Sequence, residues 1–309
     1  MSIYFCQTAF FALSAQDFAQ EDADSDWGVK YLKQSIEQVL TLKTIESDIR
    51  LDVYVDGNEY SARGRYEEQA LPKPLAGEFL RSMYRLDVNF LTNIPAVPGS
   101  EPNRMTVVCH LSEDREQNQI WQYMSIEGEK TFNIIKIAPV ENAIKQSKKE
   151  PRFTQISEVR NLGGLAGQLR QIDRFYEFSK PAQSETLAED GSIDVLKIVG
   201  VLRPAYFDTL IKQFGGLDKK KKYPPAFPSD IEIWLGRQDG FPYKIRYLNR
   251  PSEKSVKRSL LLQSSYFNVI LNGEEIPSVR FATFEQGEYL DGVFGFQDIT
   301  AAFIKSLGL

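Results

Sequence analysis

The chain has 309 residues, of which 42% are hydrophobic, and its net charge at pH 7 is −5. This length and composition allow a sizeable apolar core, in one large domain or two ordinary ones. A negative net charge argues against nucleic acid as a partner, because nucleic-acid-binding proteins usually present a basic face. The single histidine, His110, and the two separated cysteines, Cys6 and Cys109, exclude a zinc cage of His and Cys and a disulfide scaffold. We therefore expect no cofactor and no transition metal, although carboxylates are able to hold calcium.

Residues 1–26 are predicted to be an export signal followed by an acidic linker. An apolar run over 3–16 ends in small residues, as a signal peptide does, and cleavage is expected near residues 15–20. No Lys or Arg precedes Lys30, so the positively charged start of a typical signal is missing. A true start upstream of Met1 is one explanation, and a loosely packed tail is the alternative. No other segment has the run of about 18 apolar residues that a spanning helix needs, so we expect a mature chain without one, in the periplasm or otherwise exported.

The first predicted elements are a helix and a series of strands. Apolar residues recur at helical spacing over 27–42, which predicts an amphipathic helix. Alternation at period two then predicts strands, each with one buried and one wet face. Gly64, inside the second strand, is expected to mark a bulge or a bend. The predicted strands cover 45–55, 58–69, 77–91, 103–113, 118–127 and 130–138.

The middle of the chain changes character and then returns to strands. Two helices are predicted within a helical insertion at about 139–180, and a polar loop follows at 184–192. A strand over 192–203 leads to a short helix that begins at Pro204 and to a basic, proline-rich connection. Strong alternation then predicts three closing strands, and Asp298 is a candidate cap for a last short helix. The closing strands are predicted at 230–236, 242–249 and 259–273, the last of them ending in an Asn-Gly turn.

Several short patterns suggest chemistry, and each has a plainer structural explanation. The glycine-rich stretch 161–167 lacks the spacing of a phosphate loop, so a flexible start to a helix is favoured. Cys109 and His110 are neighbours on a strand and point to opposite faces, which argues against a nucleophile with its base. Acidic turns at 67–68 and 113–116 suggest glycoside hydrolysis only weakly, because such turns are usually solvated. The lysine run 219–222 suits anionic lipid head groups or, more often, a solvated loop.

The order of elements and several motifs resemble the LolA-like superfamily of periplasmic lipoprotein carriers and their relatives. The resemblance covers roughly residues 27–285 and is most specific in Y-F-N-V-I-L-N-G-E-E-I-P, which begins at Tyr266 and is followed by Phe281. Trp121 and Tyr123 are similar to the family's Trp-x-Tyr strand, and the overall layout resembles members of planctomycete type. No residue here matches the family's lid arginine, so none is assigned that role.

The resemblance implies a fold and a function. The fold expected is α+β: a curved antiparallel β-sheet, an unclosed half-barrel, wraps around helices in its concave face, in a single lipid-binding domain over 27–309. The function expected is non-catalytic binding or carriage of lipid or lipoprotein acyl chains in the cell envelope. The alternative is an envelope sensor or scaffold that binds a protein partner through the same cleft, and a hydrolase is a remote third.

The residues expected to line the cleft share one phase within their strands, although phase alone does not say which face is concave. The same residues would serve equally in an ordinary packed core. The expected lipid-binding residues are Ile49, Leu51, Val53, Leu86, Val88, Val107, Ile233, Leu235, Ile245, Tyr247, Phe267 and Val269.

Overall fold

The computed structural model of the chain describes residues 27–55, 58–75, 80–91, 104–114, 118–126, 129–147, 164–179, 182–187, 193–213, 216–218, 222–274 and 293–306. The predicted export signal and linker, Glu116, the lysines at 219–221 and Phe281 lie outside these residues. The helices are α2 (Trp27–Thr41), α3 (Ile137–Gln146), α5 (Gly164–Phe175), α6 (Pro204–Gln213) and α8 (Thr300–Ser306). The strands are β1 (Thr44–Val55), β2 (Asn58–Leu75), β3 (Leu80–Leu91), β4 (Arg104–Asp114), β5 (Gln119–Ile126), β6 (Glu129–Lys136), β7 (Tyr176–Glu177), β8 (Gln183–Leu187), β9 (Ile193–Leu202), β10 (Asp230–Gly236), β11 (Pro242–Asn249), β12 (Ser259–Leu271) and β13 (Val293–Asp298).

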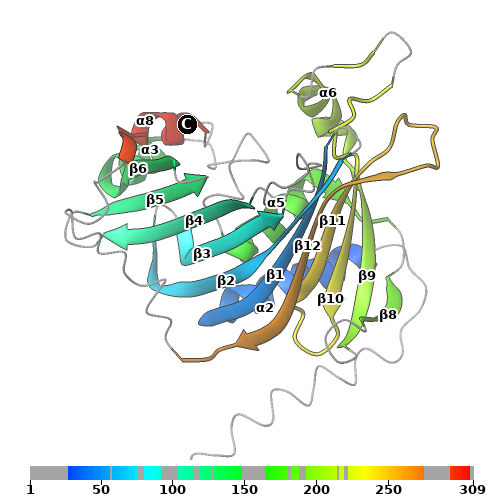
Figure 1. Cartoon of the computed structure of the whole chain (residues 1–309), viewed down its shortest axis with the longest axis horizontal. Coiled ribbons are helices and arrows are strands. Elements are labelled where there is room, and N and C mark those ends of the chain that lie inside the picture. Colours follow the sequence, from blue (N-terminus) through cyan, green and yellow to red (C-terminus); the bar gives the residue numbers. More distant parts are fainter. Residues whose placement is uncertain are drawn as a thin grey trace, which may run out of the picture.

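The described strands form one sheet of thirteen, in the order β13-β6-β5-β4-β3-β2-β1-β12-β11-β10-β9-β7, with β8 also paired to β9. Neighbouring strands are antiparallel except for the parallel pair of β13 and β6. Among the described residues, the two ends of this order do not pair with each other, so the sheet is open. Figure 1 shows its two arms, β3 to β6 and β9 to β12, diverging from β1 and β2. The predicted α+β fold class is confirmed.

The core lies on one face of the sheet because alternate residues of each strand point to it. Ile49 pairs with Tyr266 on one side and with Gly64 on the other, so these three positions share the inward face. The same inward phase continues across the sheet to Ile233 in β10 and Ile245 in β11, whose side chains are fully buried. Burial of one face only is what the period-two alternation predicts.

Two helices cover this inward face. The amphipathic stripe of α2 is buried, and α2 packs against α5. The hydroxyl of Ser35 donates a hydrogen bond of 2.6 Å to the carbonyl of Gly240, which ties α2 to the turn between β10 and β11. The two helices therefore lie where the predicted concave face requires them (Figure 1).

The sequence analysis missed three short strands, β7, β8 and β13. The polar loop predicted from residue 184 is wrong over β8, which pairs with β9 from Gln183↔Lys197 to Leu187↔Ile193. A strand at the sheet edge needs no apolar face, so its polar side chains gave no alternation to detect. β13 precedes the last helix, and Asp298 at its end accepts a hydrogen bond of 3.0 Å from the backbone N–H of Thr300, as a helix cap does.

Gly64 marks a close approach of two strands. A Cβ added there would lie 1.8 Å from the backbone carbonyl oxygen of Asp87 in β3. The pairing of β2 with β1 and β3 runs through Gly64 without interruption, so a bulge at this position is wrong. The neighbouring backbone, not a positive φ, is what excludes a side chain.

We expect Gly64→Ala to destabilise the protein by about 1–3 kcal/mol, because the strands must move apart to admit a methyl group. Gly167→Ala is the matched control, since a Cβ at Gly167 in α5 meets nothing within 4 Å. That change is expected to stabilise by about 0.5–1 kcal/mol through helix propensity. Urea denaturation of both variants measures the two effects, and equal values for them would contradict the close approach.

Candidate functional site

The predicted lining residues fall into two classes of burial. Six are buried beneath the helices: Ile49, Leu51, Val88, Ile233, Leu235 and Ile245. Five are only partly buried: Val53, Leu86, Val107, Tyr247 and Val269. The first class is ordinary core, and four members of the second class, Leu86, Val107, Tyr247 and Val269, pack against that core while staying partly exposed.

The most informative contrast lies in one pair of opposed residues. Val88 of β3 pairs directly with Val107 of β4, so both side chains point inward from adjacent strands. Val88 is 1% exposed, whereas Val107 is only partly buried. Leu86 and Cys109, the next inward pair, are partly buried as well. We call Leu86, Phe90, Val107 and Cys109 the inner strip.

Phe267 lies on the opposite face from the residues predicted to accompany it. It pairs with Asp48, whereas its neighbour Tyr266 pairs with Ile49 and takes the inward place. The pairing of β1 and β12 shifts register here, and Asn268 has a φ of 50°. One extra residue in a strand reverses the phase on its two sides, so Val269 still faces inward and Phe267 does not. The prediction of Phe267 as a lining residue is therefore wrong in phase.

The start of α5 is fastened to the inward face by a buried carboxylate. Glu68 lies within β2, so the acidic turn predicted at 67–68 is wrong. Its carboxylate accepts a hydrogen bond of 3.0 Å from the backbone N–H of Leu165 and another of 2.5 Å from the hydroxyl of Tyr66. The hydroxyl of Ser82 in β3 is its third donor. These bonds join the first turn of α5 to two strands.

Two opposing effects act on the negative charge of Glu68: burial disfavours it, and the N-terminus of α5 favours it. Burial raises the pKa of this carboxyl, and the hydrogen bonds from Ser82, Tyr66 and Leu165 oppose that rise. The N-terminus of a helix favours a negative group, because its free N–H groups carry a partial positive charge. At the start of α5, the carboxylate of Glu68 thus takes the place that a bound phosphate would take at a phosphate loop.

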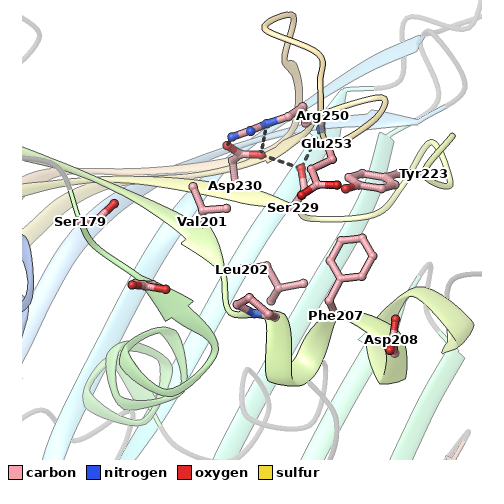
Figure 2. A pocket seen from close by; sticks show the side chains of 12 residues that line it. Ser179, Val201, Leu202, Phe207, Asp208, Tyr223, Ser229, Asp230, Arg250 and Glu253 are labelled. Atoms are coloured by element: carbon pink, nitrogen blue, oxygen red, sulfur yellow. Dashed lines mark hydrogen bonds and ion pairs between the residues drawn. The ribbon is translucent and has the colours of Figure 1, made fainter. Parts of the chain in front are cut away.

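A second feature is a pocket at the far edge of the sheet, shown in Figure 2. Its cavity volume is about 460 Å³, and it lies among the ends of β7 and β9, the start of α6 and the loops that flank β10 and β11. Its lining residues are Glu177, Ser179, Val201, Leu202, Pro204, Phe207, Asp208, Tyr223, Ser229, Asp230, Arg250 and Glu253.

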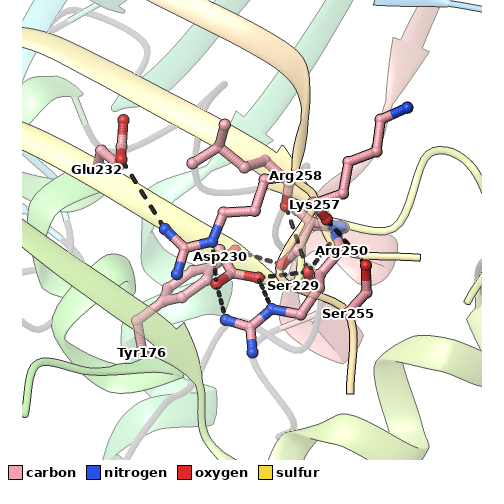
Figure 3. Close-up of polar contacts among 10 residues, drawn as sticks. Tyr176, Ser229, Asp230, Glu232, Arg250, Ser255, Lys257 and Arg258 are labelled. Carbon is pink, nitrogen blue, oxygen red and sulfur yellow. Dashed lines mark hydrogen bonds and ion pairs between the residues drawn. The ribbon is translucent and has the colours of Figure 1, made fainter. Parts of the chain in front are cut away.

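One wall of this pocket is built by a buried ion-pair cluster, shown in Figure 3. Asp230 is fully buried and binds the guanidinium of Arg250 through both of its oxygens. Arg258 adds an ion pair of 3.2 Å, and the hydroxyl of Ser229 donates a hydrogen bond of 2.7 Å to the same carboxylate. A buried carboxylate with several charged and neutral donors is a rigid element, because loss of any partner leaves it poorly solvated.

Sequence reasoning did not find this pocket. Its residues come from segments separated by up to 76 positions, between Glu177 and Glu253. Asp230 starts a strand that was predicted correctly, but no local pattern distinguishes a buried aspartate from a solvated one. The sequence shows only that Asp230 shares the outward strand face with Glu232 and Trp234, and this does not predict its burial.

Two further observations concern the described part of the chain. Within it, no group of three or more His, Cys, Asp or Glu side chains is placed to hold a metal ion. None of its helices is both long enough and apolar enough to span a membrane.

The raised pKa of Glu68 predicts a specific pH dependence. The folded state binds this proton more tightly than the unfolded chain, so the stabilisation is present below the ordinary glutamate pKa and is lost as the pH rises through the raised folded value. Urea denaturation between about pH 4 and pH 8 should show wild type losing stability relative to Glu68→Gln as pH increases. Glu37→Gln, at an exposed position of α2, controls for the loss of one charge. A relative gain for wild type with rising pH would contradict this account.

No family model and no curated protein matches the chain. Solved structures do match, each at low identity. They include a putative outer membrane lipoprotein-sorting protein domain from Vibrio parahaemolyticus, with 8% identity, 81% of this chain and 94% of that chain covered, and a TM-score of 0.32. The lipoprotein LppX of Mycobacterium tuberculosis has 11% identity, coverage of 81% and 97%, and a TM-score of 0.30. A LolA superfamily protein from Nitrosomonas europaea has 9% identity, coverage of 83% and 96%, and a TM-score of 0.22.

Proposed function

We propose that this protein binds or carries a lipid or lipoprotein acyl chain in the cell envelope, without catalysing a reaction on it. The acyl chain would lie along the inner strip of β3 and β4, beside α5. The observation that carries the proposal is the unequal cover of the inward face, since Val88 is buried and its partner Val107 is not.

The inner strip has the chemistry that an acyl chain requires. Leu86, Phe90 and Val107 are apolar, and Cys109 behaves as a small hydrophobe when it is not ionised. Burial of apolar surface contributes about 25 cal/mol per Å², so a flexible hydrocarbon gains free energy from every partly exposed group that it covers. A binding surface of this kind selects for apolar length more than for a particular head group.

The same residues support binding rather than catalysis. Cys109 pairs with Leu86, and the inward neighbours of this pair are apolar. Glu68, the nearest buried carboxylate described on this face, is occupied by three hydrogen-bond donors.

Two tryptophan substitutions test the proposal as a matched pair. Val107→Trp should fill the open inner strip and reduce binding of a fluorescent fatty acid at least tenfold, with little change in the free energy of unfolding. Val88→Trp, directly opposite, should instead destabilise the protein by about 1–3 kcal/mol through overpacking. Fluorescence titration and urea denaturation of both variants provide the two measurements.

Mass spectrometry of protein purified from the native cell adds an independent check. A lipid that accompanies wild type and is lost from Val107→Trp supports the proposal. Equal destabilisation by both substitutions, with no bound lipid, would show that the strip is ordinary core. A cross-linked protein partner without lipid would favour a sensor or scaffold instead.

A further inference from the structure

We propose that the pocket at the edge of the sheet, between β9 and α6, binds a small organic cation that carries an apolar group. The inference rests on the pocket's walls and charge, and it is independent of the inner strip. No residue of the inner strip lines this pocket.

The apolar wall of the pocket is aromatic. The rings of Phe207 and Tyr223 lie 5.0 Å apart and meet edge to face. Figure 2 shows the two rings on one side of the pocket, with Leu202 beside them. The electron-rich faces of such rings attract an ammonium group as well as hydrocarbon, which suits a ligand with both parts.

The charges that line the pocket favour a cation. In the buried cluster, Asp230 is paired with Arg250, which lines the pocket, and also with Arg258, which does not line it. Glu177, Asp208 and Glu253 also line the pocket, are exposed, and form no hydrogen bond or ion pair with another described residue. The lining therefore carries a net charge of −3. The start of α6 opposes this with a partial positive charge of only about one half.

The structure also explains why an anion would be rejected. Among the described residues, Arg250 is the one cationic side chain that lines the pocket, and both of its bonded nitrogens face Asp230. An incoming carboxylate or phosphate would have to displace that buried pair while it approached three carboxylates that pair with no other described residue. Removing a partner from a buried pair leaves an uncompensated charge, which makes that exchange unfavourable.

The test uses the full chain and benzyltrimethylammonium as the probe. Isothermal titration or NMR shift mapping should give saturable binding at residues of the pocket, weakened by added salt because the attraction is partly between exposed charges. Benzyl alcohol, which lacks the charge, and phenylacetate, which reverses it, should each bind at least tenfold more weakly.

Substitutions at exposed carboxylates identify the pocket as the site. Asp208→Asn combined with Glu253→Gln should weaken binding roughly two- to tenfold. Phe207→Leu should weaken it roughly two- to fivefold through loss of the ring face. Glu37→Gln removes one exposed carboxylate from α2, outside the pocket, and should leave binding unchanged.

Three results would overturn the inference. They are no binding of the cation at millimolar concentration, equal binding of phenylacetate, and unchanged binding after the double carboxylate substitution. Because the two substituted carboxylates are exposed and pair with no other described residue, the double variant is expected to fold as wild type does. Circular dichroism and urea denaturation check that it does.

Discussion

The described sheet has one apolar face, which the helices α2 and α5 help to cover. A strand with one apolar face must place that face against other apolar groups, and here α2 packs against β10 while α5 packs against β3 and β7. Although α5 packs against β3, Leu86 of β3 and Val107 of β4 are only partly buried among the described residues, and their phase is that of the core. Under the proposed function, the position of α5 decides which inward residues are core and which meet a ligand.

Glu68 makes that position depend on protonation. A carboxylate at a helix N-terminus is stabilised by the free N–H groups, and a buried carboxylate is destabilised by the loss of water. Both effects act on one group here, because Glu68 is 4% exposed and bonds Leu165 at the start of α5. A glutamine at this position keeps the shape of the side chain but carries no charge, so neither of these two electrostatic effects acts on a charged group. The attachment of α5 is therefore an electrostatic compromise, in contrast to the apolar packing of α2 beside it.

Local patterns predicted the strands well, but they did not give every inward position correctly. Strands 230–236 and 242–249 have the bounds predicted, because strong alternation and clear turn residues frame them. The phase error at Phe267 arose from the irregularity beside Asn268, which alternation cannot reveal because residues on either side still alternate. Burial of Glu68 escaped notice for another reason: its partners Ser82 and Leu165 lie 14 and 97 residues away. The burial of such residues is determined by contacts between strands and helices, and a short window of sequence does not contain both contacting residues.

The inner strip and the edge pocket lie on different arms of the sheet. Along the strand order, β4 and β9 are separated by β3, β2, β1, β12, β11 and β10. At about 4.8 Å between neighbours, the seven steps from β4 to β9 make a path of roughly 34 Å along the sheet. Sites this far apart, with no lining residue in common, are expected to act independently unless a shared element moves. Among the described elements, α5 is the one that could connect them. Its first turn is hydrogen-bonded to Glu68 of β2 through Leu165, and its C-terminal end runs directly into β7, which lines the pocket through Glu177. Coupling between the two ligands would therefore have to pass through the helix that Glu68 fastens.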